Sequence, residues 1–417
     1  MKTRMSIALP ANLGAALARM ALFASILPAP CAGAGPLDAG LASYRQNRLQ
    51  EALPLFEQAV SVRPEDPEPL DWLAETRRRL GRPAEAVATA RRALALRPFD
   101  SFAHTVLGDA YNPQLSAWEG ADQDSCLSHL RQAVACDSAD GNAWISLWLQ
   151  GLRIGEPDLE RRALRRIVAT GFLTQPILSY DRWLLRTLPD SAILLVNGDM
   201  DTYPAVALQA TEGLRRDVAV VNLPLLELDW YRRLIRARGV PVPFDEPELG
   251  TLPLLREGQD WILAGKRMVR GWLAMQQAGR LSRPLAAATT VEDLDFYPGA
   301  SRRLTLTGGF WLAHPDSAGT RVDTAAVRSH LMTLQPRDLA GRWNGPQDRS
   351  PIRMTSTELL RNNAVCVGLE WARALDAAGR RAEAREALVW IEGFAREVAA
   401  TPDALEKVAE LRRTLGP

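Results

Sequence analysis

Two carboxylates separated by a single residue follow a short apolar run in the middle of the chain. The apolar residues 192–196 are bounded by turn-forming residues, which is typical of a strand buried on both faces. Asp199 and Asp201 therefore follow the carboxyl end of a predicted strand, where open α/β sheets usually bind ligands. A carboxylate pair at this place could hold a divalent cation against a diphosphate, as D-x-D pairs do in many nucleotide-sugar transferases.

The same segment also has a structural explanation. Asn197 and Gly198 are typical of a turn, and Asp201 or Thr202 could cap the helix whose first turn contains Pro204. Three roles stay open for this loop: helix capping, contact with a ligand without catalysis, and metal-dependent group transfer. We favour capping and assign no catalytic residue.

A second group of candidate residues follows the next predicted strand, residues 217–223. Asp229 is most simply a helix cap, whereas Trp230 and Tyr231 could stack on a sugar ring, although aromatic residues at helix starts usually pack. Both groups should lie at the same edge of the sheet. The predicted ligand-binding set comprises Asn197, Asp199, Asp201, Thr202, Tyr203, Asp229, Trp230 and Tyr231, with Asp199 and Asp201 as the only candidate metal ligands.

The sequence does not support other kinds of catalytic, phosphate-binding or nucleic-acid-binding site. No serine, cysteine or histidine stands in a recognisable nucleophile motif, and no glycine-rich phosphate loop follows a strand. The first 34 residues hold three of the 50 basic residues and none of the 49 acidic ones, so the remainder carries 47 against 49 and no excess of positive charge for nucleic acid. We expect no cofactor, except a divalent cation if Asp199 and Asp201 act as metal ligands.

The elements that position these residues alternate between strand and helix, which predicts a small Rossmann-like α/β domain. Within a long predicted helix, Trp261, Ile262, Met268, Trp272 and Met275 recur at helical spacing, which favours a core stripe over a ligand platform. The last strand contains two adjacent glycines, as expected for an edge strand with a bulge. The predicted order is strand 192–196, helix 203–213, strand 217–223, helix 229–238, helix 257–279, strand 285–291 and strand 304–313.

A repeat precedes this domain. The pattern of residues 51–66 returns 34 residues later at 85–100, with alanines and a proline at matching places, and it resembles the tetratricopeptide repeat (TPR). A third unit has His104, Leu107, Gly108 and Tyr111 at the positions where the repeat usually has Trp, Leu, Gly and Tyr. A degenerate fourth unit follows. A similar turn at 379–384 predicts a TPR-like helical hairpin at the carboxyl terminus. The resemblance implies a concave surface that binds an extended peptide or a partner helix.

The central region carries a further resemblance. The string NGDMDTYPAVALQATEGLRRDVAVVNLPLLELDWYRRLI, residues 197–235, is similar to the soluble C-terminal region of bacterial membrane proteins of the protein O-mannosyltransferase-like class. The likeness extends over roughly residues 180–400. Those proteins carry their sugar-transfer chemistry in a multi-span membrane half that this chain lacks, so the resemblance implies an accessory region rather than the transferase.

The amino terminus has the pattern of a secretory signal. A basic start is followed by the apolar residues 20–27, a Pro-Ala-Pro segment and the small-residue site 32–34. Cys31 could be lipid-modified, although its flanking prolines disfavour this. The predicted organisation is a signal peptide at 1–34, TPR-like repeats at 35–180, the α/β domain at 181–345 and a C-terminal helical segment at 346–417.

Two function hypotheses follow. We favour a periplasmic, non-catalytic adaptor that binds an envelope protein, a peptide or a glycan through the TPR groove, the α/β crevice or both. The alternative is a metal-dependent glycosyl-group transferase, or an accessory subunit of one, that uses the loop of Asp199 and Asp201 and binds a nucleotide sugar. We expect neither nucleic acid as a partner nor a transmembrane span after signal removal.

Overall fold

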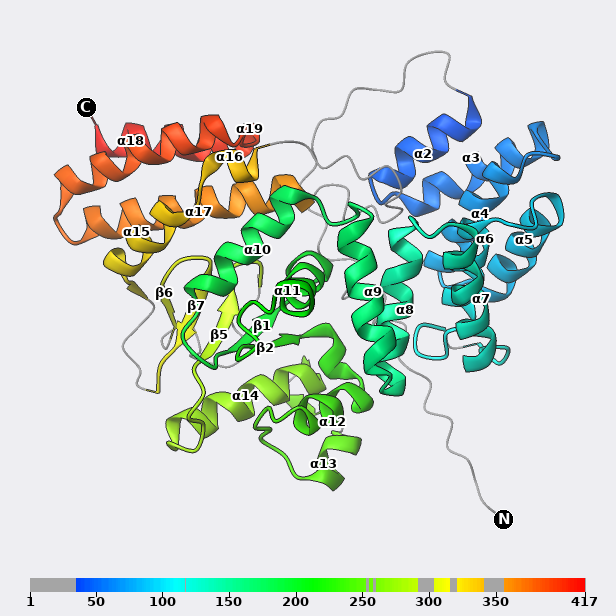
Figure 1. Ribbon diagram of the computed structural model, residues 1–417. Coiled ribbons are helices and arrows are strands. Elements are labelled where there is room, and N and C mark those ends of the chain that lie inside the picture. Colours follow the sequence, from blue (N-terminus) through cyan, green and yellow to red (C-terminus); the bar gives the residue numbers. More distant parts are fainter. Residues whose placement is uncertain are drawn as a thin grey trace.

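The computed structural model describes residues 35–416, apart from residue 117 and segments 253–254, 258–259, 292–303, 316–320 and 341–355. The predicted signal peptide and Cys31 lie outside the described residues. Eight helices form the amino-terminal part, which lies to the right in Figure 1. They are α2 (Pro36–Arg45), α3 (Leu49–Val62), α4 (Pro67–Arg79), α5 (Pro83–Leu96), α6 (Ser101–Tyr111), α7 (Gln123–Cys136), α8 (Gly141–Ile154) and α9 (Pro157–Ala169).

These helices pack as consecutive pairs, α2 with α3, α4 with α5, α6 with α7 and α8 with α9. The first helix of a pair also packs on the first helix of the next, as α4 does on α6 and α6 on α8. This arrangement is the helical-repeat architecture that the 34-residue spacing predicts. Small side chains permit the close approach, because Ala52, Ala59, Ala86 and Ala93 are all fully or almost fully buried.

Aspartates cap the first helices of three pairs and also α7, the second helix of the third pair. Asp66, Asp100 and Asp140 are the N-caps of α4, α6 and α8, and each carboxylate accepts a hydrogen bond from the backbone N–H two residues later, at 2.8–3.0 Å. Asp122 caps α7 in a similar way through the N–H of Ser125, at 2.8 Å. These caps satisfy N–H groups that have no partner within the helix, so they fix where each repeat starts.

A six-stranded mixed sheet forms the centre of the molecule, with strand order β2-β1-β5-β7-β6-β8. The neighbours β2, β1 and β5 are parallel, β7 is antiparallel to β5 and β6, and β8 is parallel to β6. The structure thus confirms a small sheet beside a helical-repeat array, but not a Rossmann-like one. The strands are β1 (Ile193–Val196), β2 (Ala219–Asn222), β5 (Leu285–Ala288), β6 (Leu304–Leu306), β7 (Phe310–Ala313) and β8 (Arg321–Val322).

Helices cover both faces of this sheet, as Figure 1 shows with α10 and α11 on one side and α12, α13 and α14 on the other. The chain leaves β1, passes through α11 to β2 on one side, and returns later to β5 on the other side of β1. The strand order therefore reverses between β1 and β5. The helices and one short 3₁₀ turn are α10 (Gln175–Thr187), α11 (Asp199–Glu212), η1 (Pro224–Glu227), α12 (Asp229–Ala237), α13 (Glu246–Thr251) and α14 (Ala264–Gln277).

The predicted helix 257–279 is wrong at its amino-terminal end. A two-stranded hairpin, β3 (Leu255–Glu257) and β4 (Asp260–Ile262), comes first, and the helix begins only at Ala264. The reason is a tertiary cap: the carboxylate of Glu227 accepts hydrogen bonds from the N–H groups of Ala264 and Gly265, at 3.0 and 2.8 Å. Met268 and Trp272 of α14 are fully buried, in agreement with a core stripe.

The predicted edge strand 304–313 is also corrected, because it is a hairpin of β6 and β7 rather than one bulged strand. Gly308 has φ +150°, a conformation that residues with a Cβ rarely adopt, and the chain reverses there. The strand β7 lies inside the sheet between β5 and β6, and β8 forms the edge.

Five helices complete the chain and lie at the upper left of Figure 1. The two longest, α17 and α18, pack against each other, and α17 also contacts α10 and α15. No helix in the described part of the chain is both long and apolar enough to cross a bilayer. The five are α15 (Thr324–Thr333), α16 (Pro336–Leu339), α17 (Ser356–Ala377), α18 (Arg381–Glu397) and α19 (Pro402–Leu415).

Candidate functional site

Asp201 caps the helix that follows β1, from inside its first turn. The helix α11 begins at Asp199, four residues earlier than the predicted start, and Gly198 is its N-cap residue. The Asp201 carboxylate accepts hydrogen bonds from the N–H groups of Asn197 and Gly198, at 3.0 and 2.9 Å, and from the hydroxyl of Thr290 after β5. Only 3% of Asp201 is exposed. Its carboxylate therefore holds the β1–α11 turn and ties it to the neighbouring strand.

The side chain of Asp199 lies on a different side of the helix from that of Asp201, because residues two positions apart are separated by about 200° around the helix axis. Asp199 is half-buried at the first position of α11, whereas Asp201 faces the interior. Within the described residues, no group of three or more histidine, cysteine, aspartate or glutamate side chains is placed to hold a metal ion. A metal shared by Asp199 and Asp201 stays a prediction.

A buried hydrogen-bond network joins the two predicted site loops. The Asn222 side chain donates to the Thr202 hydroxyl at 2.9 Å, and the Asn222 N–H donates to the Tyr231 hydroxyl at 3.0 Å. The Thr202 hydroxyl donates in turn to the Gly198 carbonyl at 2.6 Å. Burial raises the pKa of Tyr231 to about 12. Thr202 and Tyr231 thus connect the ends of β1 and β2 rather than present free groups to solvent.

The remaining candidates lie towards the helical repeats. The half-buried ring of Tyr203 packs edge-on against Trp148 of α8, with centroids 5.3 Å apart, and the indole N–H of Trp230 donates to Gln114 at 3.1 Å. Asp229 is exposed at the first position of α12, whose N-cap residue is Leu228, so the expected Asp229 cap is not formed. Tyr203 and Trp230 therefore contribute to the contact between the repeat array and the sheet domain.

The structure adds a residue that the sequence analysis missed. Asp181 of α10 is fully buried, and among the residues that the structure describes neither of its carboxylate oxygens has a hydrogen-bond partner. Burial raises the pKa of Asp181 well above its usual range, and the nearby carboxyl of Asp201 raises it further. Burial also raises the pKa of Asp201, although the hydrogen bonds from Thr290 and the backbone oppose this rise. Two carboxyl groups thus share the interior at this edge of the sheet.

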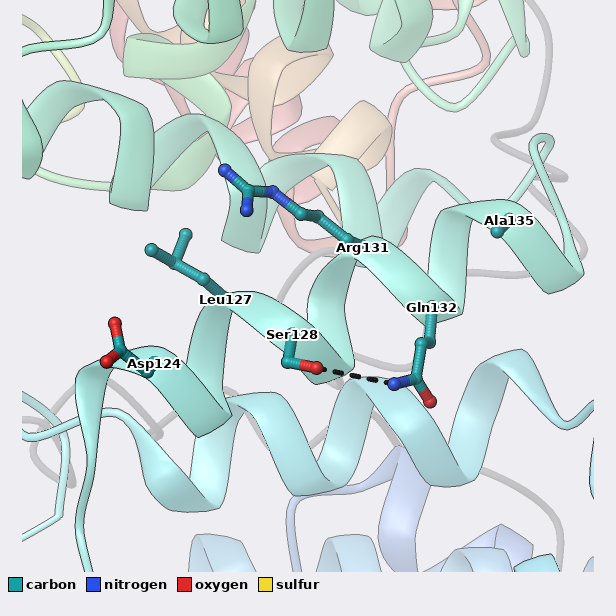
Figure 2. A pocket seen from close by; sticks show the side chains of 6 residues that line it. All are labelled: Asp124, Leu127, Ser128, Arg131, Gln132 and Ala135. Carbon is teal, nitrogen blue, oxygen red and sulfur yellow. Dashed lines mark hydrogen bonds between the residues drawn. The ribbon is translucent and has the colours of Figure 1, made fainter.

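A shallow surface hollow of about 440 Å³ lies elsewhere, on α7. Figure 2 shows its lining side chains along this one helix, with Ser128 and Gln132 joined by a hydrogen bond of 3.3 Å. None of the predicted site residues lines it. The hollow is lined by Asp124, Leu127, Ser128, Arg131, Gln132 and Ala135.

A row of aromatic rings runs across the first helices of three consecutive pairs. Tyr44 of α2 lies edge-on to Trp72 of α4, with centroids 5.1 Å apart, and Trp72 lies edge-on to Phe102 of α6, at 5.0 Å. Trp72 and Phe102 are half-buried, whereas Tyr44 is fully buried. Polar groups accompany the row, because the Tyr44 hydroxyl donates to Glu75 at 3.2 Å and Arg78 forms an ion pair with Glu75 at 2.7 Å.

Two histidines meet between α6 and α7. The Nδ1 atoms of His104 and His129 are 3.0 Å apart, so only one of them carries the shared proton. The His129 ring also stacks on Tyr111, with an interplanar angle of 8°. Burial lowers the pKa of His104, and burial together with His104 and Arg91 lowers the pKa of His129 to about 4.

This pair predicts that the chain loses stability in mild acid. Because the pKa of His129 lies below its ordinary value of 6.5 in the folded protein, the unfolded chain binds the proton more readily. The contribution of neutral His129 to the free energy of unfolding is fully present above pH 6.5, and it is lost as the pH falls towards 4. We expect the loss to be roughly 1–2 kcal/mol, after allowance for solvent screening of a part-exposed ring.

Urea unfolding at about pH 7.5 and about pH 4.5, on either side of the ordinary histidine pKa, measures this loss. His129→Gln removes the titrating ring. The free energy of unfolding of this variant should therefore decrease less than that of the wild type when the pH is lowered. Equal pH slopes for the two proteins would show that the histidine pair is not responsible.

Two family models match parts of the chain. A family model described as tetratricopeptide repeat matches residues 43–109, and one described as TMEM260-associated domain 2 matches residues 178–244. The second match contains β1, α11, β2, α12 and most of α10, and hence both Asp181 and Asp201. No curated protein sequence matches the chain.

Two solved structures are similar to part of the chain. The thermophilic TPR protein TTC0263 of Thermus thermophilus has 25% sequence identity and a TM-score of 0.33, and the match covers 49% of this chain and 98% of that one. The MamA protein has 16% identity and a TM-score of 0.28, with 53% of this chain and 96% of that chain covered. The chain thus contains a tetratricopeptide-repeat domain, followed by a segment that is similar to the TMEM260-associated domain 2 family.

Proposed function

We propose that this protein is a non-catalytic adaptor of the bacterial cell envelope that binds a protein partner through the inner face of its TPR domain. Stacked TPR pairs form a concave surface suited to extended peptides or helices. The observation that supports this proposal is the aromatic row of Tyr44, Trp72 and Phe102, which crosses three successive repeats. Aromatic side chains are enriched at protein interfaces, and tryptophan and tyrosine are enriched among the residues that contribute most to binding.

The envelope location rests on the sequence alone. The proposed signal at residues 1–34 and the resemblance of residues 197–235 to the soluble part of O-mannosyltransferase-like membrane proteins both favour export. The sheet domain would then serve as an accessory region beside a glycosylation system. In this proposal Tyr203 and Trp230 hold the repeat array to the sheet domain, and a glycan bound at the sheet edge is a second candidate partner.

Site-specific photo-crosslinking in the native host tests the proposed surface. A benzophenone amino acid replaces Phe102 in one variant and Phe99, only three residues away, in the other. Phe99 is 85% exposed in the loop before α6, whereas Phe102 belongs to the aromatic row. We expect a discrete adduct from position 102 and not from position 99, with the partner identified by mass spectrometry.

Binding of that purified partner then gives the quantitative test. Phe102→Ala should weaken binding at least about tenfold, since loss of an interface anchor commonly has such an effect. Phe99→Ala should bind as the wild type does, and circular dichroism should show both variants folded. An adduct from position 99 alone, or unchanged affinity of Phe102→Ala, would place the partner elsewhere and overturn the proposal.

A further inference from the structure

A buried carboxyl group without any partner is the feature of this fold that packing does not explain. Asp181 is fully buried on α10, and both of its oxygens lack a hydrogen bond. Buried carboxyl groups in proteins are normally paired with a cation, hydrogen-bonded, or bound to a metal ion. Asp181 has neither of the first two within the described residues.

The surroundings of Asp181 supply oxygen atoms rather than positive charge. Asp201 is close enough to act on Asp181 electrostatically. The neighbouring Tyr180 hydroxyl lies 3.4 Å from the Thr289 hydroxyl and accepts a hydrogen bond from Asn363 at 3.1 Å. Thr290 contacts Asp201 directly. No ion pair in the described part of the chain includes Asp181 or Asp201.

The position in the sheet is one where ligands bind. Asp201 follows β1, Thr289 and Thr290 follow β5, and the strand order reverses between these two strands. In open sheets with parallel strands, such a reversal leaves a crevice at the carboxyl ends of the strands. Asp181 approaches this place from α10, which packs on α11.

The burial and charge of the pair define the class of ligand. Asp181 is fully enclosed and Asp201 is 3% exposed, so a ligand of both carboxylates must be small enough to be enclosed with them, which excludes a sugar or a nucleotide. Two carboxylates carry two negative charges, which one divalent cation neutralises. Asp201 already accepts hydrogen bonds from Asn197, Gly198 and Thr290, whereas the acceptor positions of Asp181 are open within the described residues. Carboxylate and hydroxyl oxygens are the ligands of hard cations such as Ca²⁺ and Mg²⁺.

We propose that Asp181 and Asp201 together bind one divalent cation between α10 and the carboxyl ends of β1 and β5. The hydroxyl of Thr290 contacts Asp201 and supplies a further oxygen atom at this place. The ion takes the place of the proton that burial otherwise keeps on Asp181, and it fixes the first turn of α11. This site differs from a D-x-D site, because Asp199 takes no part in it.

Thermal unfolding of the full chain, freed of metal with EDTA, tests this site. Ca²⁺ and Mg²⁺ are added separately at constant ionic strength. One of them should raise the Tm progressively, by about 3 °C when its concentration reaches a hundred times the dissociation constant. Without metal, Asp181→Asn should melt close to the wild-type temperature, because burial keeps the proton on Asp181 and the amide replaces a neutral carboxyl group of the same size. With metal, its Tm should not move.

Asp199→Asn is the matched control, since it changes the other carboxylate of the D-x-D sequence on the same helix turn. It should keep the full wild-type shift. Equilibrium dialysis should find one ion per wild-type chain and none in Asp181→Asn. The proposal is overturned if neither cation shifts the wild-type Tm, if Asp181→Asn keeps the shift, or if Asp199→Asn loses it.

Discussion

Gly108→Leu is expected to lower the free energy of unfolding by about 3 kcal/mol, at the upper end of overpacking effects. A Cβ at Gly108 of α6 would lie only 2.6 Å from two side-chain atoms of Leu130 on α7 and 3.3 Å from the backbone carbonyl of Cys126. Leu130 and Cys126 are fully buried, so neither can move aside without displacing its neighbours. A leucine would therefore force α6 and α7 apart in the third repeat.

Gly393→Leu is the matched control for this substitution. Gly393 lies inside the helix α18, and a Cβ there meets no atom within 4 Å. The same chemical change should therefore stabilise the protein by about 0.5–1 kcal/mol, because leucine is a better helix former than glycine. Urea unfolding of both variants measures the difference. If the two substitutions had the same effect, close packing at Gly108 would not be the constraint.

The repeat array could be predicted because each of its determinants is local. The small residues, the proline after the second helix and the 34-residue spacing are all visible in the sequence, and Asp66 and Asp100 cap the helices next to them. A signature glycine such as Gly108 is informative for the same reason, since its neighbours in space belong to the same repeat.

The sheet domain was predicted less well because its boundaries depend on distant residues. The start of α14 is set by Glu227, 37 residues earlier, and its carboxylate is invisible to any local pattern. Two adjacent glycines such as Gly308 and Gly309 are typical both of a bulge and of a hairpin turn, so the local sequence does not distinguish the two. Only the pairing of β7 with β5 as well as with β6 decides between them.

Asp181 shows what a sequence pattern can reveal about a site and what it cannot. It stands four residues after Ile177 and three before Leu184, two fully buried residues, so helical spacing places it on the buried face of α10. That spacing could have identified an acid in the core. Its proximity to Asp201 could not have been predicted, because it depends on how α10 packs against α11.

Trp272→Ala is expected to lower the free energy of unfolding by about 4 kcal/mol, as deletion of a buried tryptophan commonly does. Trp272 of α14 is the largest of the fully buried side chains in the described part of the chain, and its indole N–H donates to the Pro241 carbonyl at 2.6 Å. The substitution would leave a cavity under the sheet and an unpaired carbonyl in the loop that follows α12. Unfolding in urea, followed by far-ultraviolet circular dichroism, measures the loss.

Trp230→Ala supplies the comparison, because this half-buried ring on α12 donates its N–H to Gln114 in the repeat array. We expect a loss of about 1 kcal/mol there, since much less apolar surface returns to water. A loss of about 4 kcal/mol for Trp272→Ala would show that the Trp272 ring is packed in the core, as the helical spacing of Met268 and Trp272 predicts. A loss below about 1 kcal/mol would instead mean that the ring is dispensable for folding, and α14 would then have to be considered as a surface for a ligand.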